Sequence, residues 1–135
     1  RRPRSQPDAA GVAERARRDA ENLTAEFRRL ERWAATIAGR GHEAFLDPTD
    51  ETNYLAAQAV VINLAEALER RTPDAVLGAA IPEGVGTVRG MRNRLAHDYL
   101  FVDKGVVWDA ISRDVPELLG RLLAEGVIVP ERFMR

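Results

Sequence analysis

The 135-residue chain lacks cysteine, and it has only one lysine and two histidines. The missing cysteine excludes disulfides, thiolate metal sites and a cysteine nucleophile, and it fits the reducing environment of the cytoplasm. The histidines, His42 and His97, lie far apart in the sequence and form no metal-binding spacing. We therefore predict no metal site and no cofactor.

Long apolar runs are also missing from the sequence. No run approaches the ~20 residues that span a bilayer, and the basic start at residues 1–4 lacks the apolar core of a signal peptide. These absences predict a cytoplasmic protein that does not bind membranes. The formal net charge is -1, so a polyanion would have to meet a local basic patch.

Helical periodicity is what the sequence has in abundance. Apolar residues recur at intervals of three and four, and they predict helices at 8–39, 49–70, 73–79, after Gly84 and from residue 103 onward. No segment alternates with a period of two, so no sheet is expected. The three longest stripes consist of Ala16, Ala20, Leu23, Phe27, Leu30, Ala34 and Ile37; of Tyr54, Ala57, Val61, Leu64 and Leu68; and of Val107, Ile111, Val115, Leu118 and Leu122.

These segments predict an all-α fold, an up-and-down bundle of four main helices plus a short one. The chain is expected to form a single domain over residues 1–135, because no linker is long enough to divide it. Within it, residues 1–8 are expected to be a disordered basic start, and residues 127–135 a C-terminal tail.

A few residues carry local expectations. Phe45 to Pro48 predict a loop, and His42 is expected to be an ordinary surface residue. Pro116 falls inside the last helix and should kink it or remove a backbone hydrogen bond. Trp33 and Trp108 fall at or beside core stripes, so both are expected to pack in the core.

Reactive side chains are concentrated in one segment, from Met91 to Leu100. At 3.6 residues per turn, Asn93 and His97 lie within about 40° of each other, and Arg92 and Tyr99 within about 20°. Arg92 and His97, however, are about 140° apart. Either the long side chain of Arg92 curls across the helix, or a second copy of the helix completes the arrangement, as a two-fold interface allows.

These groups suit the cleavage of a phosphodiester in RNA. His97 can remove a proton from the 2′-hydroxyl or supply one to the leaving oxygen. Arg92 can hold the phosphate and stabilise its developing charge, and Asn93 can donate to the phosphate or orient the imidazole. The alternative is a solvated helix face on which Asp98 offsets the arginines, and residue chemistry alone favours that alternative.

A resemblance to a known family changes this balance. The segment from Gly90 to Tyr99 resembles the Arg-Asn-x-x-x-His-x-Tyr motif of HepT-type toxins, which belong to the HEPN superfamily. The likeness covers roughly residues 49–123. It implies an α-helical HEPN homodimer with a composite cleft between two motif helices. It also implies metal-independent endoribonuclease activity, with Arg92 and His97 as the catalytic residues and Asn93 as their phosphate-binding or orienting partner.

The same resemblance implies a protein partner. In bacterial type II toxin–antitoxin pairs of this kind, a minimal nucleotidyltransferase antitoxin transfers AMP from ATP to the motif tyrosine, which is Tyr99 here. A nucleotide on Tyr99 would bring negative charge and bulk to the cleft where RNA phosphate must bind. Two other functions stay open: a non-catalytic HEPN subunit that binds a nucleotidyltransferase and presents its substrate, and a structural dimerisation module.

The first predicted helix is rich in arginine, but it gives no clear indication of RNA binding. Acidic residues alternate with the arginines, so a salt-bridged solvated face is at least as good an interpretation as a phosphate-facing surface. The arginines concerned are Arg15, Arg17, Arg18, Arg28, Arg29 and Arg32.

Overall fold

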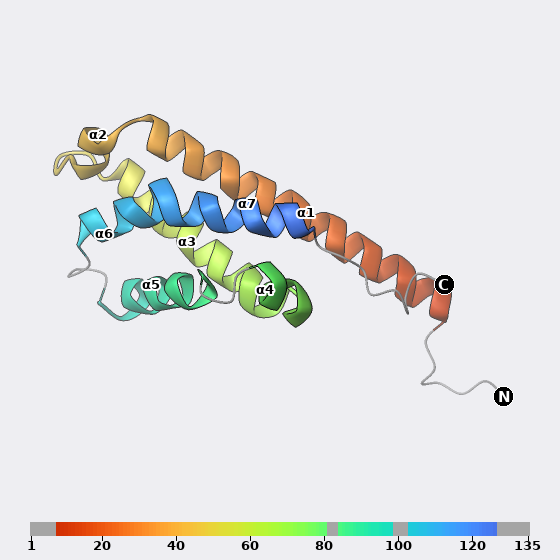
Figure 1. The fold of residues 1–135 in the computed structure, drawn as a ribbon. Helices are drawn as coiled ribbons and strands as arrows, with labels where there is room; N and C mark the ends of the chain where they lie inside the picture. The colour runs from red at the N-terminus through yellow and green to blue at the C-terminus, as the bar shows by residue number, and fades with distance from the viewer. Residues whose placement is uncertain (1–7, 81–83, 99–102, 127–135) are drawn as a thin grey trace.

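The chain folds into a bundle of helices. The computed structural model describes residues 8–80, 84–98 and 103–126, and all regular structure in these ranges is helical (Figure 1). The predicted all-α class is therefore confirmed. In chain order the elements are α1 (Ala9–Gly39), α2 (His42–Leu46), α3 (Thr52–Arg70), α4 (Asp74–Ala80), α5 (Gly84–Asp98), α6 (Lys104–Asp109), the π-helix η2 (Ala110–Asp114) and α7 (Val115–Glu125).

Helix α1 is the longest element and follows the predicted bounds. Asp8 caps it by accepting a hydrogen bond from the Ala10 backbone N at 3.3 Å, and Gly41, with φ at 97°, turns the chain after its end. Its stripe is buried only from Leu23 onward, because the first turns extend past the other helices (Figure 1). Nearly half of α1, the part before Leu23, therefore lies outside the core.

The core lies where α1 packs against α3 and α7, and α3 packs in turn against α5 (Figure 1). The apolar stripes predicted for α3 and for the last helix are buried throughout. In the first helix the same is true of the five residues from Leu23 to Ile37. The helical spacing of apolar residues thus identified the core faces of the long helices, because another helix packs along the buried part of each apolar stripe.

The loop predicted at Phe45 to Pro48 is wrong in its first half. Phe45 lies in the five-residue helix α2 and is fully buried, with its ring 5.9 Å from that of Tyr54 and 5.3 Å from that of Trp108. One turn of helix is too short to show a periodic stripe, so only the packing reveals it. His42 begins α2 and is exposed as predicted, with its ring 5.1 Å from Trp108.

Side chains fix both ends of α3. At its start, Asp50 Oδ1 accepts from the Thr52 backbone N at 3.0 Å and from its hydroxyl at 2.6 Å. These hydrogen bonds, the one from the hydroxyl first, hold the pKa of Asp50 below its usual value. At the other end, the buried hydroxyl of Thr72 donates to the Ala67 carbonyl at 3.0 Å. Helix α3 is therefore held at both ends by side-chain hydrogen bonds.

Pro116 was predicted to kink the last helix or to remove a backbone hydrogen bond, and the structure has a π-turn just before it. Proline has no N–H for the carbonyl four residues earlier and crowds it, and the helix before Pro116 widens into η2. There the Val115 backbone N donates to the Ala110 carbonyl, five residues back. The helical path therefore continues from α6 through η2 into α7 and keeps the stripe of Val107 to Leu122 on the core.

Candidate active site

The motif segment lies on α5, and the packing of this helix decides which motif residues reach the surface. Val88, Met91 and Leu95 are buried and anchor α5 against α3. Arg92 follows Met91 by 100° around the helix, and its side chain is 31% exposed. Asn93 lies a further 100° around the helix, on its outer side, and is exposed.

Arg92 is held by two carboxylates that the sequence did not single out. Its Nη2 lies 3.4 Å from Glu66 Oε2, and its Nη1 lies 3.4 Å from Glu69 Oε2. Both glutamates come from α3 and sit one helical turn apart. The guanidinium therefore bridges the two glutamates across the packing of α5 on α3.

Each glutamate uses its other oxygen for a second arginine. Glu66 Oε1 lies 2.9 Å from Nε of Arg70, and Glu69 Oε1 lies 3.7 Å from Nε of Arg89. The result is a chain of alternating charges with Arg92 at its centre, which we call the arginine–glutamate chain: Arg70, Glu66, Arg92, Glu69 and Arg89. With three cations and two anions, this surface carries one net positive charge.

The other motif residues are only partly described. His97 belongs to the last turn of α5, but its side chain lies outside the described part of the structure. Tyr99, predicted as the modification site, also lies outside the described residues. Among the described residues, the side chain of Asn93 has no hydrogen-bond partner. The joint action of Arg92 and His97 therefore stays a prediction.

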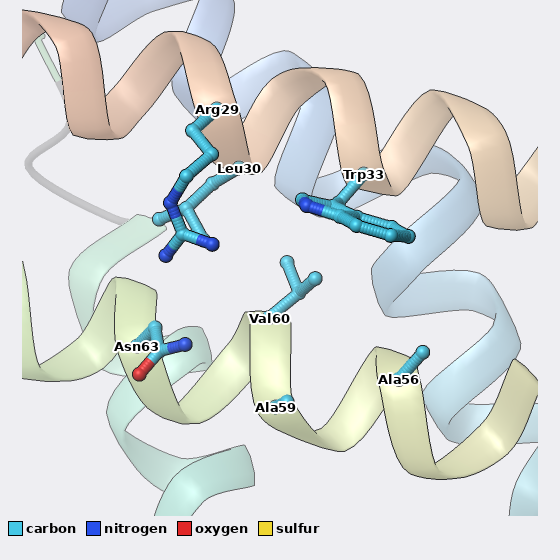
Figure 2. Close-up of a pocket in the computed structure, with 7 residues that line it drawn as sticks. All are labelled: Arg29, Leu30, Trp33, Ala56, Ala59, Val60 and Asn63. Carbon is cyan, nitrogen blue, oxygen red and sulfur yellow. The ribbon is translucent and has the colours of Figure 1, made fainter. Parts of the chain in front are cut away.

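A groove between α1 and α3 is a second feature of the surface. Trp33 from α1 lies over it, with the side chain of Val60 beneath the ring, and Arg29 and Asn63 approach each other at one end (Figure 2). Its volume is about 240 Å³. The prediction that Trp33 packs in the core is wrong: its exposed fraction is 46%, because the small side chains of Ala56 and Ala59 leave the space open.

Apolar side chains also line the outer face of α3. Leu55 and Ile62 are exposed by 54% and 41%, although both are large and aliphatic. At 100° per residue, Leu55, Ala59, Ile62 and Glu66 fall within a sector of about 60°. We call Leu55, Ala59 and Ile62 the α3 apolar row. The row borders the groove at one side and ends at Glu66 of the arginine–glutamate chain. An apolar centre with a charged rim is typical of protein interfaces.

The arginines of α1 show two ion pairs within the helix. Arg17 pairs with Glu14, and Arg29 pairs with Glu26 at 2.6 Å. The hydrogen bond from Arg29 holds the pKa of Glu26 below its usual value. For these two arginines the interpretation as a salt-bridged face is confirmed.

The described residues contain neither a cluster of metal ligands nor a helix that could cross a membrane. No group of three or more His, Asp or Glu side chains in the described ranges is arranged to hold a metal ion. No helix among those that the structure describes is long and apolar enough to cross a membrane.

Comparison with known families relates most of the chain to a described family. A family model described as ribonuclease HepT-like matches residues 27–123. The matched region begins in the buried part of α1 and includes α3, α5 and nearly all of α7. No solved structure matches the chain.

Proposed function

Because the chain belongs to the HepT-like ribonuclease family, we propose that it is a metal-independent endoribonuclease that acts as the toxin of a type II toxin–antitoxin pair. The observation that carries the proposal is the position of Arg92 at the surface of α5, beside Asn93 and one turn before His97. The buried residues Val88, Met91 and Leu95 hold this helix against α3, and Asn93 lies on the side opposite to them.

The proposed chemistry needs only side chains of the motif. The 2′-oxygen of a nucleotide attacks the adjacent phosphorus, the bond from phosphorus to the 5′-oxygen breaks, and a 2′,3′-cyclic phosphate and a 5′-hydroxyl result. His97 removes the proton from the 2′-hydroxyl or supplies one to the leaving 5′-oxygen. Arg92 stabilises the additional negative charge on the phosphate oxygens in the transition state, and Asn93 donates a hydrogen bond to the phosphate or orients the imidazole.

We further propose that the cleavage site is composite, formed by two copies of the chain. Arg92 and His97 are about 140° apart on an ideal helix, so a partner copy can supply what one copy cannot bring together. The α3 apolar row and the groove under Trp33 support this, because they leave apolar surface uncovered next to the motif helix. A two-fold axis near this surface would bring two α5 helices together.

The proposed off-switch is the transfer of AMP to Tyr99 by a nucleotidyltransferase antitoxin that uses ATP. Attack of the tyrosine oxygen on the α-phosphorus of ATP forms the phosphodiester and releases pyrophosphate. The modification would place an anion two residues from His97, where it repels and blocks an RNA phosphate. Support for this step comes from the family and from the position of Tyr99 in the motif.

The direct test is cleavage of cellular RNA by purified protein in excess EDTA. We expect the wild-type protein to cut, and His97→Ala and Arg92→Ala to lose at least a hundredfold in rate, since removal of a single general acid–base or charge-stabilising group costs roughly that much. An inactive wild-type protein would leave the non-catalytic partner subunit or the dimerisation module. Normal cutting by both variants would overturn the assignment of the site.

A further inference from the structure

We propose that Glu66 and Glu69 are positioning residues for Arg92, and that they raise the rate of the chemical step while weakening the binding of RNA. The inference deepens the proposed function and depends on it for the catalytic role of Arg92. Neither glutamate belongs to the motif, and both lie on α3 rather than on α5.

The geometry gives the first argument. The two terminal nitrogens of Arg92 each face a different carboxylate at 3.4 Å, so the plane of the guanidinium is fixed from both ends. An arginine side chain otherwise has many rotamers, and ordering one costs entropy at the moment of reaction. A guanidinium that is already oriented can stabilise a phosphoryl transition state without that cost.

The outer arginines give the second argument. The carboxylate oxygen of Glu66 that does not face Arg92 lies 2.9 Å from Arg70, and that of Glu69 lies 3.7 Å from Arg89. Each carboxylate is therefore attracted by a second arginine as well as by Arg92. Arg89 Nε is buried and, among the described residues, has no hydrogen-bond partner. The Arg89 side chain as a whole is 42% exposed, so Arg89 attracts Glu69 as a nearby charge rather than through a hydrogen bond.

Stability alone does not explain this arrangement. The ion pairs of Arg92 are partly exposed, with side-chain exposed fractions of 31% for Arg92, 40% for Glu66 and 33% for Glu69. Pairs of this kind contribute little to folding because water and salt screen them. The arginine–glutamate chain can instead restrict the direction in which the guanidinium of Arg92 points.

The same carboxylates have an opposite effect on binding. An RNA phosphate that approaches Arg92 also approaches two negative charges, which repel it. Removal of the carboxylates should therefore strengthen RNA binding while it frees the guanidinium to rotate. A split between a lower kcat and an unchanged or tighter Kd is a signature that simple loss of folded protein does not produce.

The test compares Glu66→Ala/Glu69→Ala with wild-type protein in single-turnover RNA cleavage and in binding to a 2′-O-methyl oligonucleotide, which has no attacking hydroxyl. We expect the cleavage rate to fall roughly tenfold or more, because a small misplacement of a catalytic group is costly, and the oligonucleotide Kd to stay equal or decrease. Glu66→Gln/Glu69→Gln keeps one acceptor oxygen per residue and should recover part of the rate. Glu117→Ala on α7, whose carboxylate pairs with Arg121 at 2.8 Å, removes one ion-paired carboxylate elsewhere and should change neither value.

A second readout does not depend on activity. Rotation of the Arg92 guanidinium, followed by NMR of its side-chain nitrogens and assigned by their loss in Arg92→Lys, should be slow in wild-type protein and fast in the double alanine variant. Cleavage by that variant at or above the wild-type rate would overturn the positioning role, and so would free rotation in wild-type protein. If the wild-type protein cuts no RNA, the ribonuclease proposal fails, whereas the rotation measurement still decides whether the glutamates hold Arg92.

Discussion

Arg92 and Asn93 are neighbours in α5, yet they have different surroundings. Arg92 turns toward α3 and contacts Glu66 at 3.4 Å, whereas Asn93 is exposed. The difference follows from the 100° step between consecutive helical residues and from the burial of Met91 just before them. Arg92 therefore has a role in the contacts between helices as well as in the motif, and Asn93 is available to a ligand.

Substitution of Asn93 should affect cleavage without affecting stability. In Asn93→Ala we expect the loss of one hydrogen bond to a charged phosphate, about 1.5–3 kcal/mol, which corresponds to a roughly ten- to hundredfold lower rate. The melting temperature should stay close to that of wild-type protein, because the residue is exposed. Rate and melting temperature are measured on the same samples. A normal rate would remove Asn93 from the site.

The α3 apolar row provides a test of self-association. Leu55→Glu places a charge in the row about 17 Å along the helix from Glu66, far enough to leave the arginine–glutamate chain intact. We expect a monomer in light scattering at concentrations where wild-type protein is a dimer, together with lower specific activity. Val106→Glu, at an aliphatic residue on α6 that is exposed by 39%, is the matched control. A dimeric and fully active Leu55→Glu protein would place the interface elsewhere.

The modification proposal has its own test in intact mass. Coexpression with a nucleotidyltransferase antitoxin of the proposed kind should add one or more adenylyl groups to wild-type protein, and Tyr99→Phe should remove the addition at that site. The modified protein should cut RNA far more slowly, because the added phosphate repels the substrate. An unchanged mass increase in Tyr99→Phe would assign the modification to another residue.

The capping interaction of Asp50 predicts a pH dependence of stability. The folded-state pKa of Asp50 is lowered by the Thr52 hydroxyl and backbone N–H. The stabilisation is therefore present above about pH 4, the usual range of an aspartate, and is lost as pH falls through the lower folded pKa. Asp50→Ala should lower the melting temperature at neutral pH, with a difference that shrinks in acid. Asp19→Ala, at an exposed residue of α1, controls for the loss of charge.

Most of the fold follows from the sequence because its long helices are amphipathic. The stripe from Tyr54 to Leu68 is buried as predicted, and the bounds of α1 agree within a residue. The short helix α2 was missed because a single turn has no period to detect. The exposure of Trp33 was missed as well, since it depends on which side chains face it from α3, and in the groove these include two alanines.

The site was predictable only in part. The sequence identified Arg92 through the motif, but it gave no reason to select Glu66 and Glu69. A signal was present in retrospect: glutamates three apart on one helix and Arg89 and Arg92 three apart on another form matching pairs on helical faces. Which two helices face each other is decided by packing of the whole bundle, and no local pattern contains that information.

The measurement that tests the central claim most directly uses a heterodimer of one Arg92→Ala chain and one His97→Ala chain. The two chains are coexpressed with different tags, and the heterodimer is purified through both tags. In a composite site, Arg92 of one chain acts with His97 of the other, so one of the two clefts in each heterodimer is complete. We predict that each variant alone is inactive and that the heterodimer recovers about half of the wild-type rate of RNA cleavage in EDTA. A heterodimer as inactive as its parents would contradict the composite site, and full activity of either parent would contradict the catalytic roles of Arg92 and His97.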